Sequence, residues 1–287
     1  FEPGSSIKPL IIAAALESGD YRPGSLVDTA PGFVTVGAKT IEDSENLGRV
    51  TLTTILARSS NVGVTKLAMT LQPDQLWETM TQFGFGALTT SGFPGESAGR
   101  LTYFSHWKPI SQATLAYGYG VSVTPLQLAQ AYAVLGNGGG MRPISLVGID
   151  QPGDSQQVIS QDTAVAVRRM LEEVVRPGGT GTKASVDGYR IAGKTGTAWK
   201  AAEGGYSEDK YISIFAGLAP ASDPRLATVV VIDEPGGELY YGSDVAAPVF
   251  ADVMAESLRL LAVAPDAMPP REPGAEVQAM AKRTPSR

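Results

Sequence analysis

Ser5-Ser6-Ile7-Lys8, close to the start of the chain, is the first of three short strings that decide its fold. The other two are Ser59-Ser60-Asn61 and Lys194-Thr195-Gly196-Thr197. Their forms are S-x-x-K, S-x-N and K-T-G. The first two forms also occur at Ser105–Lys108, Ser207–Lys210 and Ser44–Asn46, whereas K-T-G occurs once. The surroundings of each copy must therefore separate functional copies from chance ones.

The composition is that of a globular protein without a nucleic-acid partner. The 287 residues are 43% hydrophobic and 18% charged, which suits one large domain or two intertwined subdomains. The net charge of −6 and the lack of a basic stretch argue against nucleic-acid binding. The absence of cysteine excludes thiol catalysis and thiolate metal sites. We expect no cofactor and no metal, because His106 has no second histidine with which to share one.

The apolar pattern predicts helices first and strands later. Helical spacing runs from Ile7 to a stop at Gly19 and recurs at 52–57, 62–69, 125–135 and 162–175. Strand-like stretches follow at 189–197, 211–218 and 226–233, and a helix at 245–261 covers them. This order predicts an α+β fold in which an antiparallel sheet flanked by helices meets a helical subdomain at a cleft.

Ser5 and Lys8 form a candidate nucleophile and base. Three residues apart on a helix, their side chains share one face. A serine needs a neighbour to take its proton, and a lysine accepts one only when its amine is neutral. Burial and a second cation, for which Lys194 is a candidate, would lower the Lys8 pKa. Pro9 cannot donate to the Ser5 carbonyl, so we expect a capped or distorted first turn.

Ser59 and Asn61 lie at a predicted corner between two helices. The hydroxyl is suited to pass a proton to a leaving amine, and the amide to orient Lys8 and a substrate carbonyl. An ordinary helix N-cap explains the same string equally well.

The K-T-G string falls on a strand that we place at the sheet edge. Thr195 and Thr197 offer hydroxyls, and Lys194 a positive charge, to a substrate carboxylate. Gly196 would let a ligand backbone approach the strand. The alternative is a solvated edge strand protected by its lysine.

Other stretches extend the pattern beyond the three strings. They are Phe1-Glu2-Pro3-Gly4, Gly92-Phe93-Pro94-Gly95-Glu96, Tyr117-Gly118-Tyr119-Gly120, Gly179-Thr180-Gly181-Thr182-Lys183-Ala184 and Phe215-Ala216-Gly217. With them, residues 1–262 resemble the transpeptidase domain of class B penicillin-binding proteins, most closely the division-specific penicillin-binding protein 3. Residues 263–287, rich in proline and charge, are expected to form a flexible tail.

The resemblance implies a peptidoglycan D,D-transpeptidase of the septal cell wall. Ser5 would attack the D-Ala-D-Ala bond of a stem peptide with Lys8 as base, and a neighbouring stem's amine would resolve the acyl-enzyme. Amides of Ser5 and Thr197 would form the oxyanion hole, and β-lactams would acylate Ser5. Tyr240 and Tyr241 fall where relatives carry an aromatic wall, although packing of a strand-end loop explains them equally well.

The resemblance also implies a location and partners. It places the protein on the periplasmic side of the bacterial inner membrane, with a polymerising glycosyltransferase and other divisome membrane proteins as partners and no nucleic acid. No run of 18 apolar residues occurs, so we expect the anchoring helix upstream. In the family a helix and strands precede S-x-x-K, so we also expect an upstream segment to complete the domain and cover its open strand edges.

Two other classes of function remain open. A serine β-lactamase or β-lactam sensor shares the three strings, but no Glu-x-x-Leu-Asn string supplies a base for deacylation. A non-catalytic division scaffold is the second alternative. Four further groups are assigned structural roles: His106 as a structural residue without a catalytic or metal-binding role, Trp107 and Trp199 as packing residues, and Glu42, Asp43 and Glu45 as a solvated acidic loop.

Overall fold

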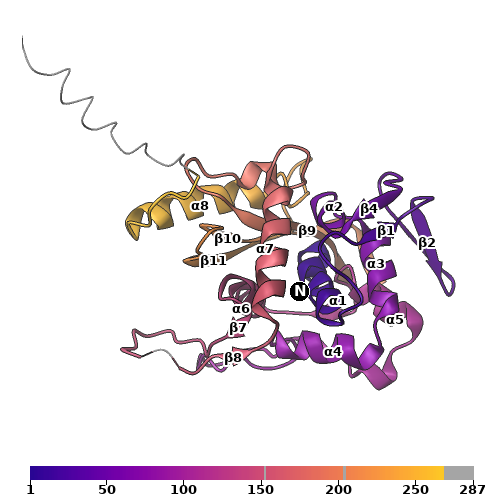
Figure 1. Ribbon diagram of the computed structural model, residues 1–287, viewed down its shortest axis with the longest axis horizontal. Coiled ribbons are helices and arrows are strands. Elements are labelled where there is room, and N and C mark those ends of the chain that lie inside the picture. Colours follow the sequence, from indigo (N-terminus) through magenta and orange to yellow (C-terminus); the bar gives the residue numbers. More distant parts are fainter. Residues whose placement is uncertain (152, 203–204, 268–287) are drawn as a thin grey trace, which may run out of the picture.

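The computed structural model describes residues 1–151, 153–202 and 205–267. Its central element is a three-stranded antiparallel sheet of order β11-β10-β9 (Figure 1). The strands are β9 (Ala192–Ala202), β10 (Gly205–Ala219) and β11 (Leu226–Asp233). Helices pack on both faces, so the predicted α+β class is confirmed.

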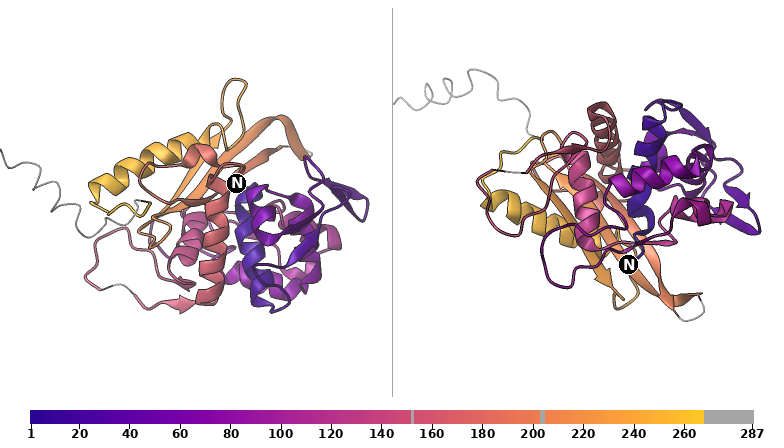
Figure 2. Two further views of the ribbon diagram at one scale, coloured as in Figure 1. Left: turned by 45° about the horizontal axis from the view of Figure 1, so that its top comes forward. Right: turned by 90° about the horizontal axis from the view of Figure 1, so that it is seen from below.

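The two faces of the sheet belong to two cores, because side chains alternate along a strand. On β10, Ile214 and Leu218 join the larger core with α6 (Pro125–Gly136) and α7 (Gln161–Val175). Phe215 points the other way, toward α8 (Ala246–Leu260), where its ring lies 4.6 Å from that of Phe250. Figure 2 shows α8, in yellow, covering one face of the orange strands.

A helical region packs beside the sheet, and its helices surround one buried helix. Its helices are α1 (Lys8–Glu17), α2 (Leu52–Ala57), α3 (Asn61–Thr70), α4 (Pro73–Gln82) and α5 (Pro109–Leu115). Residues 8–15 of α1 are all buried, as expected of a helix that is apolar on every side. Contacts of α1 with α2, α3, α4 and α7 place it at the centre of the larger core.

Short strands and turns complete the chain. Four two-stranded ladders pair β1 (Leu26–Asp28) with β4 (Arg49–Thr51), β2 (Phe33–Val36) with β3 (Lys39–Glu42), β5 (Arg100–Leu101) with β6 (Val121–Ser122), and β7 (Gly140–Met141) with β8 (Gln156–Gln157). The 3-10 turns are η1 (Gly4–Ile7), η2 (Phe104–His106) and η3 (Thr182–Ala184). No helix in the described ranges combines the length and hydropathy needed to cross a membrane.

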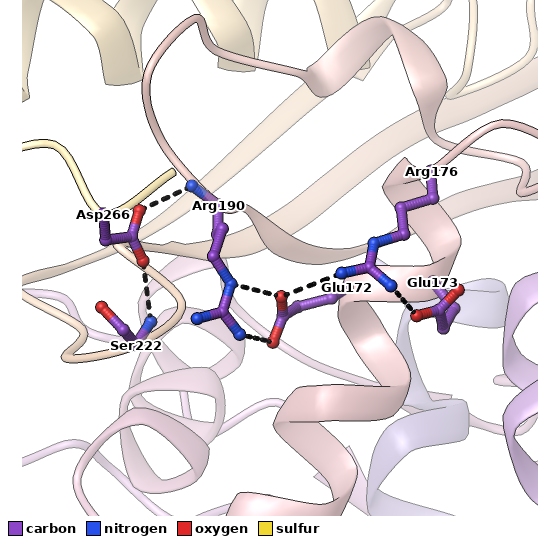
Figure 3. Close-up of polar contacts among 6 residues, drawn as sticks. All are labelled: Glu172, Glu173, Arg176, Arg190, Ser222 and Asp266. Carbon is purple, nitrogen blue, oxygen red and sulfur yellow. Dashed lines mark hydrogen bonds and ion pairs between the residues drawn. The ribbon is translucent and has the colours of Figure 1, made fainter. Parts of the chain in front are cut away.

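The start of β9 is tied to the chain beyond α8. The predicted strand began at Tyr189, but β9 begins at Ala192, because the residues before it make other bonds. Tyr189 Oη donates to the Val263 carbonyl at 2.6 Å, and the Arg190 amide donates to Asp266 Oδ1 at 2.7 Å. The Arg190 guanidinium also donates twice to buried Glu172 on α7, at 2.9 and 2.8 Å (Figure 3). Of the predicted tail, residues 263–267 thus contact the body, and the rest lies outside the described residues.

Candidate active site

Ser5 lies in the 3-10 turn η1, immediately before α1. The Lys8 amide donates to the Ser5 carbonyl, three residues back, because Pro9 has no N–H to donate from four residues on. The distortion predicted from Pro9 is therefore confirmed. The Ser6 hydroxyl donates to the Pro3 carbonyl at 2.6 Å, and Tyr132 Oη donates to the Ser6 carbonyl at 2.9 Å. These bonds hold the turn that carries Ser5, the candidate nucleophile.

Lys8 is fully buried, and its amine reaches the corner between α2 and α3. Nζ donates to the Ser59 carbonyl at 2.5 Å, to Asn61 Oδ1 at 2.7 Å and to Ser59 Oγ at 3.2 Å. Among the described residues it makes no hydrogen bond to Ser5 Oγ. The structure thus places Ser5, Ser59 and Asn61 around one cavity, with Lys8 buried and hydrogen-bonded to Ser59 and Asn61.

Both lysines of the site have lowered pKa values. Burial lowers the pKa of Lys8 well below its ordinary value, the charge of Lys194 lowers it further, and Asp43 opposes the shift. The influence expected of Lys194 on Lys8 is thus confirmed. Burial also lowers the pKa of Lys194, to about 7. Each amine is therefore far easier to deprotonate near neutral pH than a lysine in water.

The corner itself serves two purposes. Ser60 is the N-cap of α3, and its Oγ accepts from the Gly63 amide at 2.8 Å. Ser59 has a φ of +56°, a left-handed conformation that costs a non-glycine residue about 1–2 kcal/mol. Ser59 thus lies between the end of α2 and Ser60, the N-cap of α3. The capping interpretation is right for Ser60, while Ser59 and Asn61 contact Lys8.

Asp43 holds this corner, so the prediction that it belongs to a solvated acidic loop is wrong. Its Oδ1 accepts from the amides of Asn61 at 2.5 Å and Val62 at 3.0 Å. Its Oδ2 accepts from the Ser60 hydroxyl. Asp43 therefore binds the N-terminus of α3 from 18 residues upstream of Asn61. A cap so far away along the chain has no local sequence signal.

Lys194 reaches the Ser59 hydroxyl, which Lys8 also contacts, from the sheet. Although β9 is an edge strand, as predicted, Lys194 is fully buried. The alternative of a solvated, protective edge lysine is therefore wrong. Its Nζ donates to Ser59 Oγ at 2.9 Å and to the Thr195 carbonyl at 3.2 Å. The Thr195 hydroxyl lies 3.0 Å from that of Thr180, whose place in the site has no signal in the sequence beyond the family-like stretch 179–184.

Gly196 and Thr197 have different surroundings. A β-carbon on Gly196 would lie 3.0 Å from the Pro3 carbonyl oxygen and 3.2 Å from Ile214 Cβ. The glycine thus makes room for the turn that carries Ser5, which corrects the expectation that it makes room for a ligand. Thr197 Oγ1 accepts from the Gly242 amide at 3.0 Å, so its own hydrogen remains available to donate to a ligand.

Two cavities meet at Ser5, and both are lined by Asn61, Thr197 and Tyr241. The first, which we call the Ser59 cavity, has a volume of about 290 Å³ and is also lined by Ser59, Thr180 and Thr195. The second, the aromatic cavity, has a volume of about 270 Å³ and is also lined by Tyr117, Tyr119, Trp199, Tyr211 and Tyr240.

The aromatic residues line the aromatic cavity and also pack on one another. Tyr240 stacks on Tyr211 with ring centroids 4.0 Å apart and 15° between the planes. Tyr241 is 52% exposed and faces both cavities. Trp199 is 49% exposed beside Tyr119 in the aromatic cavity, so the prediction that it is a packing residue is wrong. Trp107 does pack, and its Nε1 donates to the Thr102 carbonyl at 2.9 Å.

The other S-x-x-K copies lack this environment. Ser105 and Lys108 are both exposed around η2, as is His106 between them. Ser207 donates to Asp209 Oδ1 at 2.7 Å, and the exposed Lys210 forms an ion pair with Glu234 at 3.2 Å. Neither lysine is desolvated, so neither is suited to act as a base.

Comparison with known proteins gives concordant findings. Residues 1–255 match the family model of the penicillin binding protein transpeptidase domain. The chain is 43% identical over 268 residues to peptidoglycan D,D-transpeptidase FtsI of Escherichia coli K12, covering 93% of this chain and 45% of that protein. It is 42% identical to the probable peptidoglycan D,D-transpeptidase PbpC of Pseudomonas aeruginosa, with 93% and 47% covered.

A solved structure agrees with the fold. The apo transpeptidase domain of Burkholderia pseudomallei penicillin-binding protein 3 superposes with a TM-score of 0.89 at 41% identity, covering 94% of this chain and 82% of that one. The chain spans about half the length of the two curated relatives named above.

Proposed function

The chain belongs to the family of penicillin-binding-protein transpeptidase domains, and we propose that it is the catalytic domain of a D,D-transpeptidase that cross-links stem peptides of the septal cell wall. The observation that carries the proposal is the chain of contacts from Lys8 through Ser59 to Lys194, beside Ser5 at the meeting point of two cavities.

Acylation begins with the Ser5 hydroxyl. A neutral Lys8 amine has two N–H donors, which match the Ser59 carbonyl and Asn61 Oδ1, its two shorter contacts. Its lone pair is then free to take the Ser5 proton as Oγ attacks the carbonyl of the D-Ala-D-Ala bond. The lowered Lys8 pKa supports this role, because a protonated amine has no lone pair to offer.

The departing D-Ala needs a proton on its nitrogen. Ser59 Oγ lies 3.2 Å from Lys8 Nζ and 2.9 Å from Lys194 Nζ. The proton taken from Ser5 therefore reaches the leaving amine through Lys8 and Ser59. Because Ser59 contacts both lysines, the hydroxyl is held at the point where the two subdomains meet.

Two further groups stabilise the bound substrate. The Ser5 amide is the second in its 3-10 turn and has no partner within it, which suits an oxyanion hole shared with the Thr197 amide. Each such donor typically contributes about 3 kcal/mol to the transition state. Thr195 and Thr197, with Lys194 behind them, provide hydroxyls and charge for the terminal carboxylate, while Tyr240 and Tyr241 line the path of the acyl group.

We propose that the protein acts at the cell envelope. We place it on the periplasmic side of the inner membrane, anchored by an upstream helix, with a polymerising glycosyltransferase and other divisome membrane proteins as partners. Family membership and the similarity to a penicillin-binding protein 3 domain support this placement.

Intact mass after incubation with benzylpenicillin, followed by peptide mapping, tests the catalytic proposal. We expect one adduct, on Ser5, with Ser105 and Ser207 clean. Slow loss of the adduct would exclude a β-lactamase, whereas rapid turnover would favour one. A chain that forms no adduct would be a non-catalytic scaffold, and an adduct on a control serine would overturn the assignment of the nucleophile.

A further inference from the structure

An ion pair lines the Ser59 cavity. Glu45, in the loop before β4, accepts from the Arg58 guanidinium at the end of α2, and both side chains line the cavity. Arg58 is 45% exposed and Glu45 49% exposed. Neither residue has a role in the proposed acylation, although both line the Ser59 cavity.

The Ser59 cavity is the side of the site through which the leaving amine departs. Ser59 protonates that amine, and Ser59 lines this cavity but not the aromatic one. An amine that attacks the acyl-enzyme must approach along the same path, because aminolysis is the reverse of amine expulsion. The second substrate therefore enters the Ser59 cavity, which Glu45 and Arg58 line.

The pair retains hydrogen-bonding capacity for a ligand. Within the described part of the chain, the bond to each other is the only one that either side chain makes. Arg58 thus keeps free N–H donors, and Glu45 keeps one free oxygen. The other carboxylate of the cavity, Asp43, is fully engaged with the N-terminus of α3. Glu45 is therefore the carboxylate of this cavity with a free acceptor.

We propose that Glu45 and Arg58 form the acceptor subsite and select an amine that carries a carboxylate on the same carbon. Arg58 binds the carboxylate, for which its planar guanidinium is suited, and Glu45 binds the ammonium, which releases one proton to the surrounding water before its nitrogen attacks. An amine without the carboxylate would occupy Glu45 but leave Arg58 unused. This inference rests on the proposed function, because it needs an acyl-enzyme to resolve.

The aminolysis step balances with the groups described. The amine nitrogen bonds to the acyl carbon while the bond from that carbon to Ser5 Oγ breaks. One amine proton passes to Ser59 Oγ, whose own proton passes to Lys8 and then to Ser5 Oγ. The products are the new amide and free Ser5, with Lys8 neutral again.

Two matched acceptors test the inference in the same chain. An acyl-D-Ala thioester serves as donor, with D-methionine or its decarboxylated amine as acceptor, and chromatography measures aminolysis relative to hydrolysis for each. The readout is the preference for D-methionine, which is the ratio of aminolysis by D-methionine to aminolysis by the decarboxylated amine. Both amines react with the same acyl-enzyme, so any change in the rate of acylation cancels in this ratio. We expect Arg58→Gln to reduce this preference about fivefold or more, and Glu45→Gln to reduce aminolysis by both amines.

Arg259→Gln is the matched control, because Arg259 also pairs with an exposed glutamate, Glu256, but on α8. It should retain the wild-type preference. An unchanged preference in Arg58→Gln, or an equal loss in Arg259→Gln, would overturn the subsite. If the wild-type chain forms no acyl-enzyme with the thioester or with benzylpenicillin, the proposed function has failed instead.

Discussion

The backbone of Gly118 lies against that of Gly4, so that a β-carbon on residue 118 would come 2.0 Å from the Gly4 carbonyl oxygen. The Gly4 amide also donates to the Gly118 carbonyl at 3.2 Å. The segment after α5 therefore supports the turn that carries Ser5, from more than a hundred residues away along the chain.

Replacing Gly118 by alanine should displace this turn. No side chain can relax to relieve a β-carbon that meets backbone at 2.0 Å, so we expect Gly118→Ala to destabilise the fold by about 3 kcal/mol or more and to slow penicillin acylation at least tenfold. Gly120→Ala is the control. Its φ of +79° imposes similar strain, but its β-carbon has 3.8 Å to the nearest atom. Equal losses of stability and acylation rate in both variants would contradict a specific role for the Gly4 contact.

Lys8→Arg should abolish acylation while the chain remains folded. Arginine keeps the positive charge but does not give up its proton in a protein, so it cannot act as a base. Stopped-flow acylation rates and thermal unfolding provide the measurements. Lys66→Arg is the control, because Lys66 is partly exposed and donates to the Asp28 carbonyl, away from the site. A Lys8→Arg rate within tenfold of wild type would show that Lys8 acts only through its charge.

Asp43→Ala should weaken the corner that presents Ser59 and Asn61. Three donors lose their acceptor, and loss of a helix cap costs about 1–2 kcal/mol. We expect a melting temperature lower by about 2–8 °C and slower acylation. Glu42→Ala removes the neighbouring exposed carboxylate, whose side chain makes no hydrogen bond in the described structure, and should change the melting temperature little. Indistinguishable melting curves for the two variants would refute the capping role.

Stability should rise with pH above neutrality because of Lys194. The pKa of this amine is about 7 in the folded chain, against an ordinary value of 10.5. Between these values the unfolded state binds more protons, so the free energy of unfolding increases with pH, by up to about 1.4 kcal/mol per pH unit. Below pH 7 Lys194 is protonated in the folded chain, so the free energy of unfolding is lowered by the full cost of burying its charge. Above 10.5 that cost is gone.

Lys194→Met should flatten this rise. Urea unfolding from about pH 7 to about pH 9 compares the slopes of the two proteins. Lys8, whose pKa is also lowered, contributes a rise of the same sign that persists in the variant. Parallel curves for wild type and variant would mean that Lys194 stays protonated in the fold.

The sequence by itself determined the fold class and the main catalytic candidates. Helix α2 and strand β11 have the predicted bounds, 52–57 and 226–233, because the spacing of apolar residues is a local property of the chain. Ser5, Lys8, Ser59 and Lys194 were identifiable because each of their strings is short and keeps its spacing in any fold. The distortion at Ser5 was predictable for the same reason, since Pro9 acts on the turn that contains it.

Only the tertiary structure decided which chemistry each residue has. Lys8 and Lys210 each follow a serine at the same spacing, but only Lys8 is buried next to a second cation, and burial depends on the packing of the whole chain. Asp43, Gly118 and Trp199 belong to the site through contacts with segments distant in sequence. The sequence indicates that Gly196 needs space, and the structure shows that its neighbour is the chain's own turn at Pro3, because η1 packs against β9.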